Sequence, residues 1–202
     1  MTQGLVVFLA LLCAATLRAQ DFPSVINAAL YDLTNEGVDT IIVYFPAFND
    51  QIPTAEQEKQ PYYLFWQRNG RQFQRKFANM QPAGEVMQSP DAEITTLAAE
   101  HLDEIENEEI LQPYYRQYQD SDTVWIMFPP TNYLKDIFLI QADGRRIVKM
   151  ADVGSLDAKE FFAEGVFNIH FEVNAALFTT KLRKNIIALT AEPGKRNNAQ
   201  NK

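Results

Sequence analysis

The chain has 202 residues, of which 47% are hydrophobic and 22% charged, with 26 acidic residues against 18 Lys and Arg and a single cysteine. The acidic balance argues against a nucleic-acid partner, because binding to phosphates relies on a basic surface. One cysteine excludes both a disulfide within the chain and a zinc site built from cysteines.

Residues 1–19 have the pattern of an export signal. A thirteen-residue run, apolar except for Thr16, extends from Leu5 to Leu17, and the small residue Ala19 stands where a signal peptidase would cut. The run is shorter than the roughly 20 residues that a membrane-spanning helix needs. We therefore predict a cleaved signal peptide over 1–19 and no membrane span after cleavage. An uncleaved N-terminal anchor is the alternative.

The predicted mature chain holds 183 residues and no thiol, because Cys13 lies inside the apolar run. It carries 26 acidic residues against 17 basic ones, a net charge of −9. A chain of this length can bury a stable core without cross-links. The absence of disulfides and of Asn-x-Ser/Thr sequons suits a secreted or periplasmic protein of a bacterial envelope.

Two helices and two strands are predicted ahead of the hairpins. Apolar residues recur at helical spacing from Phe22 to Leu33 and again from Ser89 to Ile105. Runs rich in β-branched and aromatic residues, at 39–45 and 122–128, are typical of buried strands. Each run is followed by a proline, which we expect to end the strand.

Two hairpins are predicted from their corner residues. Asn69-Gly70 lies between the two halves of 62–77, and Asp143-Gly144 lies between the two halves of 137–150. Asn-Gly and Asp-Gly favour a two-residue type I′ turn, because both central residues of that turn need a positive φ.

The two-residue corner sets the register of the first hairpin. It pairs Arg68 with Arg71 and divides the side chains of the hairpin between two faces. We expect the face of Trp66 to be mainly core. The opposite face, which carries Tyr63 and Phe65 among glutamines and a lysine, is expected to be a mostly wet surface.

The chain also contains an internal similarity. Asp39–Asn49 aligns without gaps with Asp122–Asn132 and is identical to it at five positions, and a hairpin follows each segment. We predict two tandem helix-strand-hairpin units at 20–88 and 89–154. The predicted fold class is α+β, with helices packed on an antiparallel sheet built from these units plus a C-terminal helix and strands.

The C-terminal part is predicted to continue with a short helix at 155–162 and a half-buried strand at 167–173, where apolar and polar residues alternate. The pattern of 175–189 fits either a helix or a strand. Residues 155–191 form this C-terminal segment, and the polar stretch 192–202 is expected to be a disordered tail.

No pattern in the sequence indicates a catalytic, metal or cofactor site. His101 falls within the apolar stripe of its predicted helix, and His170 falls on the polar side of its predicted strand. We expect a partly buried structural histidine and a surface histidine, respectively. Neither belongs to a metal-binding pattern, and no serine lies in a Gly-x-Ser-x-Gly motif.

Charged and aromatic clusters remain as candidates for binding. Residues 91–109 contain eight acids and no Lys or Arg, which is typical of a solvated helix face. Exposed tyrosines beside arginines suit recognition of a protein or a glycan. The candidate binding residues are Tyr63, Phe65, Arg68, Arg71, Lys76, Tyr114 and Tyr115.

These observations favour an exported, non-enzymatic binding module that recognises a protein or glycan through an aromatic and basic sheet surface. One alternative is a hydrolase that uses carboxylates with His101 or His170. The other is a self-associating structural subunit of the envelope. The sequence does not decide the oligomeric state.

Overall fold

The computed structural model describes residues 24–49, 60–79, 81–89, 92–112, 115–120, 123–127, 134–153, 156 and 166–191. The chain divides into two compact units, residues 1–36 and residues 37–202. The predicted signal peptide, the tail at 192–202 and most of the predicted helix at 155–162 lie outside the described residues. None of the described helices is both long and apolar enough to cross a membrane.

The described part of the first unit is one helix. Helix α2, Ser24–Asn35, matches the predicted helix to within two residues at its C-terminal end. Ile26 and Leu30 are buried and lie four residues apart, so they share one face of the helix.

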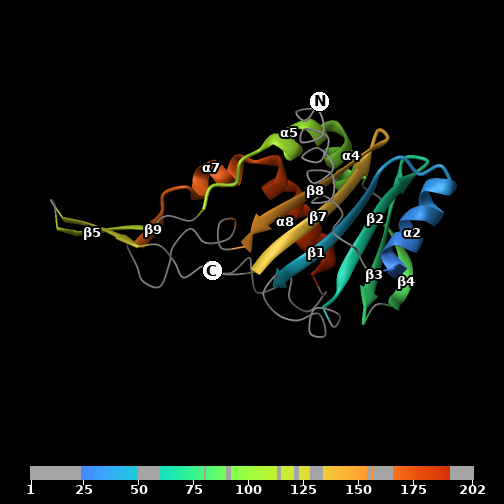
Figure 1. Cartoon of the computed structure of the whole chain (residues 1–202), viewed down its shortest axis with the longest axis horizontal. Coiled ribbons are helices and arrows are strands. Elements are labelled where there is room, and N and C mark those ends of the chain that lie inside the picture. The colour runs from blue at the N-terminus through green and yellow to red at the C-terminus, as the bar shows by residue number, and fades with distance from the viewer. Residues whose placement is uncertain are drawn as a thin grey trace, which may run out of the picture. The chain divides into compact units, whose positions relative to one another are not determined.

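A six-stranded antiparallel sheet dominates the second unit (Figure 1). Its strand order is β4-β3-β2-β1-β7-β8, so the strands from the N-terminal half meet those from the C-terminal half where β1 pairs with β7. The strands are β1 Ile41–Asn49, β2 Tyr62–Arg68, β3 Arg71–Ala78, β4 Gln81–Ser89, β7 Leu134–Ala142 and β8 Arg145–Asp152.

Both predicted hairpins are confirmed, corner and register alike. Asn69 and Gly70 have φ of 52° and 72°, and Asp143 and Gly144 have φ of 51° and 72°. Positive φ at both central residues is the geometry of a type I′ turn. The strands of each hairpin pair in the predicted register, beginning with Arg68 opposite Arg71 in the first.

One face of the sheet, which we call the helix face, is covered by α4 (Glu93–Glu100), α5 (Leu102–Asn107) and α8 (Phe178–Thr190) (Figure 1). The buried core between them includes Ile42, Phe65, Phe138, Ile140, Ile94, Ile105, Leu182 and Ile186. The opposite face of the sheet also carries buried apolar side chains, namely Ile41, Val43, Leu64, Trp66, Phe77 and Leu139. The central strands are therefore buried on both faces.

A side chain of the sheet caps one of these helices. Gln72 of β3 is 1% exposed, and its Oε1 accepts hydrogen bonds from the backbone N–H groups of Ile94 and Thr95, both at 3.1 Å. These two groups belong to the first turn of α4, where backbone donors have no partner inside the helix. The amide of Gln72 therefore fixes α4 to the sheet.

The tandem-unit prediction is not confirmed. Strands β5 (Tyr115–Asp120), β6 (Thr123–Met127) and β9 (Val166–Asn168) form a separate three-stranded sheet in the order β6-β5-β9. The segment β1 pairs with its following hairpin, whereas the similar segment β6 pairs with β5. Sequence similarity between the two strands thus does not give them equivalent places in a sheet. β1 also continues past Pro46 to Asn49, with a register shift after Phe45.

The C-terminal predictions are partly wrong. The strand expected at 167–173 ends at Asn168, and α7 (Phe171–Ala176) follows. The side-chain oxygen of Asn168 accepts a hydrogen bond from the N–H of His170 at 3.1 Å, which turns the chain. The apolar side of the expected alternation is not a buried face, since Ile169 is 41% exposed. The ambiguous segment 175–189 is mainly the helix α8.

Helix α8 is held to the sheet by a buried ion pair. Nε of Arg183 contacts Oδ2 of Asp136 on β7, and both side chains are nearly inaccessible to solvent. The hydroxyl of Tyr44 on β1 donates to the same carboxylate oxygen at 2.9 Å. The carboxylate is thus paired with a charge and with a hydroxyl, which is the condition for burying it.

Removing one partner of this pair should destabilise the fold. We expect Arg183→Met to lower the free energy of unfolding by about 3–5 kcal/mol, because it leaves a buried carboxylate without its charge partner. The double variant Arg183→Met/Asp136→Asn should recover much of the loss, since Asn is neutral and can still accept from Tyr44. Urea denaturation measures both. An equal loss in the two variants would contradict this account.

Candidate functional site

Two of the predicted binding residues, Tyr63 and Phe65, do not form an exposed surface. Phe65 is fully buried and Tyr63 is half-buried, and both pack on the helix face with their ring centroids 6.5 Å apart. The expectation of a wet face is wrong because α4 covers this part of the sheet. The glutamines that suggested solvent, Gln72 and Gln74, are themselves buried there.

We therefore expect Phe65→Ala to lower the free energy of unfolding by about 3–5 kcal/mol, because it opens a cavity in a packed core. Phe65→Leu keeps most of the volume and should cost clearly less. Chemical denaturation of the two variants against the unchanged protein makes the comparison. If Phe65→Ala lowered the free energy of unfolding by less than about 1 kcal/mol, Phe65 would not be a core residue.

The basic candidates separate onto two faces of the first hairpin. Arg68 and Arg71 are exposed, lie opposite each other beside the corner, and share the face opposite to the helices. Lys76 is exposed on the helix face, opposite Tyr63. Tyr114 and the side chain of Tyr115 lie outside the described residues, so their predicted role stays a prediction.

A third arginine completes a basic row on the hairpin. Arg75 lies on the same strand and face as Arg71, with Phe73 between them. We call Arg68, Arg71 and Arg75 the arginine row. Its members come from β2 and β3, and the positions of all three follow from the hairpin register.

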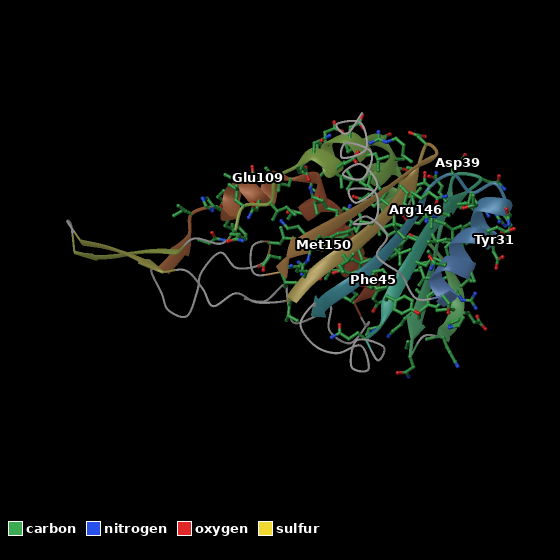
Figure 2. All side chains as sticks on the ribbon, in the orientation of Figure 1. Tyr31, Asp39, Phe45, Glu109, Arg146 and Met150 are labelled. Carbon is green, nitrogen blue, oxygen red and sulfur yellow. The ribbon has the colours of Figure 1, made fainter. Side chains whose placement is uncertain are left out.

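Aromatic rings lie beside the arginine row on the same face. Tyr62 stacks on Phe77 with a centroid distance of 5.2 Å and contacts Phe45 at 5.3 Å, and Trp66 stacks on Phe73 at 5.7 Å. Phe45, which is labelled in Figure 2, belongs to the neighbouring strand β1. Tyr62, Trp66, Phe77 and Phe45 are nearly inaccessible to solvent, as expected for the face that the sequence assigns to the core. Among these rings, that of Phe73 is partly exposed beside the arginines.

Arg75 is unusual within the row because part of its side chain is buried without a partner. Its Nε has no hydrogen-bond partner among the described residues. The guanidinium carbon lies 5.9 Å from the centroid of the Phe77 ring, within the range of a cation–π contact. A buried donor left unpaired costs free energy, so it marks a place where a further acceptor would be favourable.

The aromatic group should make the fold sensitive to alkaline pH. Burial raises the pKa of Tyr62 above its ordinary value. In the unfolded chain the phenol ionises near pH 10, whereas the folded chain resists ionisation until higher pH. The stabilising contribution is therefore complete below about pH 10 and is lost as the pH rises through the folded pKa.

We expect the free energy of unfolding to fall between about pH 8 and pH 11, and to fall less in Tyr62→Phe, which has no phenol to ionise. Denaturation curves at the two pH values measure the difference. Tyr31→Phe, a change at a side chain that is 68% exposed, is the control and should decline as the unchanged protein does. An identical decline in Tyr62→Phe would remove Tyr62 as the cause.

Both histidines have structural surroundings. The ring of His101 stacks on Phe178 with centroids 3.7 Å apart, and its Nδ1 lies 3.5 Å from Oε1 of Glu104. Nδ1 of His170 lies 2.8 Å from the backbone oxygen of Gln112, so it donates a hydrogen bond there. His101 is thus the partly buried residue expected from its position in the apolar stripe, and it lies at the break between α4 and α5.

The acidic segment at 91–109 is mostly a solvated surface, as expected, but several of its acids contribute to tertiary structure. Asp103 and Glu106 both pair with Arg145 of β8. The carboxylate of Glu108 accepts hydrogen bonds from the backbone N–H groups of Phe178 and Thr179 at the start of α8. A carboxylate at a helix N-terminus is stabilising, because it satisfies free donors and complements the helix dipole.

The described residues contain no cluster of His, Cys, Asp or Glu able to hold a metal ion. No family model matches the chain, and comparisons with curated proteins and with solved structures also found no match. The candidate functional site is therefore defined by its geometry alone, as the arginine row with the partly exposed ring of Phe73.

Proposed function

We propose that this chain is exported to the periplasm or the outside of the cell and acts there as a non-enzymatic interaction module. It binds an acidic segment of a protein partner through the arginine row. The export signal predicted at 1–19 supports the compartment. The presence of three arginines on one face of β2 and β3 supports binding to an acidic segment.

The observation that carries this proposal is the pairing of Arg68 with Arg71 directly across the hairpin. Both side chains are exposed, so two guanidinium groups lie side by side where an anionic segment can reach them. Guanidinium groups suit this role, because they bind carboxylates through two parallel hydrogen bonds.

The partly exposed ring of Phe73 supplies apolar area next to the charges. Phe73 lies between Arg71 and Arg75 on β3 and is half-buried. Binding sites that combine arginine with aromatic side chains gain affinity from both charge pairing and desolvated apolar contact. The net charge of −9 predicted for the mature chain makes this local basic face distinctive.

The test is affinity capture from the native envelope, with the mature chain as bait, followed by titration of the captured protein. We expect Arg68→Gln/Arg71→Gln to weaken that binding by about tenfold or more, since each lost contact of this kind costs more than 1 kcal/mol. Binding should also weaken as salt is raised, because the charges are exposed.

The control is Lys76→Gln/Lys184→Gln, which removes the same charge from two exposed residues outside the row. This variant should bind as the unchanged chain does. Equal loss in both double variants would show that only net charge matters. Capture of an anionic glycan in place of a protein, or binding that is unaffected by the arginine variant, would overturn the proposal.

A further inference from the structure

The edge strand β8 has features of an unfilled pairing site. Among the described strands it pairs only with β7, and it ends the order of the six-stranded sheet. Val148 and Met150 on this strand are 38% and 42% exposed, respectively. They lie on the face opposite to α5, and Figure 2 labels Met150 together with Arg146 of the same strand.

The hairpin corner determines which backbone groups of β8 point to the free edge. A two-residue turn closes on a hydrogen-bonded pair, here Ala142 with Arg145, and hydrogen-bonded pairs then alternate along the ladder. The odd-numbered residues of β8 therefore bond to β7. The N–H and C=O groups of Arg146, Val148 and Met150 point outward, where a further strand can bond to them.

The side chains of this edge are complementary to themselves when the strand is read in the reverse direction. On the face opposite to the helices, β8 presents Arg146, Val148, Met150 and Asp152 in that order. Reversed, the same series places the acid against the base and the apolar residues against each other. Such a pattern suits an isologous contact, in which one patch meets its own copy.

We infer that two copies of this chain associate through β8, antiparallel, about a two-fold axis that passes at Lys149. In this register Arg146 of each copy lies opposite Asp152 of the other, and Val148 of each lies opposite Met150 of the other. The two six-stranded sheets then form one continuous sheet. The contact is small, so we expect a dimer that dissociates on dilution.

The central pair, Lys149 with its own copy, brings two like charges together on the helix face. Each amine is held away from the edge, because Nζ of Lys149 contacts the backbone oxygen atoms of Glu106 and Glu108 at the end of α5. The like charges are therefore not an obstacle to this register.

Neighbouring registers fit less well. An axis at Val148 would place Arg146 opposite Met150 of the other copy, and would leave Asp152 opposite the turn residue Gly144. With an axis at Met150, the position opposite Arg146 would lie beyond the end of β8 in the other copy. The register about Lys149 is the one that pairs both charges and both apolar side chains.

Sedimentation equilibrium of the mature chain, over a range of concentrations, tests the association. We expect a monomer–dimer equilibrium whose dissociation constant rises more than about tenfold in Arg146→Asp and in Asp152→Arg, because each change opposes like charges twice per dimer. The double variant Arg146→Asp/Asp152→Arg should restore dimerisation. Lys76→Asp, at an exposed residue of β3 outside the arginine row, is the charge-matched control and should dimerise normally.

Cysteine cross-linking tests the register, since the predicted mature chain has no cysteine of its own. Lys149→Cys should form a disulfide between copies on oxidation, because opposing residues at the axis lie within bonding reach. Val148→Cys should cross-link far less. A strictly monomeric protein, no rescue by the charge exchange, or stronger cross-linking at 148 would overturn the inference. None of these outcomes depends on the arginine row.

Discussion

The surfaces of this protein depend on the backbone conformation at two hairpin corners. Positive φ at Asn69-Gly70 and at Asp143-Gly144 closes each hairpin in two residues and fixes its register. Since side chains alternate between faces, a shift by one residue would exchange the faces of every side chain in the strand. The register set by these corners determines the face on which the arginine row lies. It also determines the face on which β8 carries Arg146, Val148, Met150 and Asp152.

The corner residues are also the part of the fold that could be predicted from sequence, because a type I′ turn is a local property of two residues. Which face of a hairpin is covered depends on distant elements and could not be predicted in the same way. Gln72 illustrates this. In the sequence it indicates a solvent-facing position, but its amide is buried because it caps α4. The face of Tyr63 and Phe65 was therefore expected to be wet although it is covered, whereas the face of Trp66 is mainly core, as expected.

Long-range pairing likewise lies beyond local pattern. The segments at β1 and β6 have similar sequences, but β1 is flanked by β2 and β7, whereas β6 belongs to another sheet. The pairing of β1 with β7 brings Tyr44 to Asp136, and the carboxylate in turn holds α8 through Arg183. Nothing in the local sequence of these residues indicates that they meet. The strand β4, which contains Pro82 and Gly84, was missed for a related reason, since such residues are common only at sheet edges.

The two edges of the main sheet share one chemical property. Met87 on β4 and Met150 on β8 are both exposed thioethers, and the predicted mature chain has no thiol to react in their place. Oxidation to the sulfoxide would turn either apolar side chain into a polar one without touching the core. In an oxidising compartment, oxidation of these two methionines would thus change the polarity of the sheet edges, where it would weaken apolar contacts with a further strand while leaving the core unchanged.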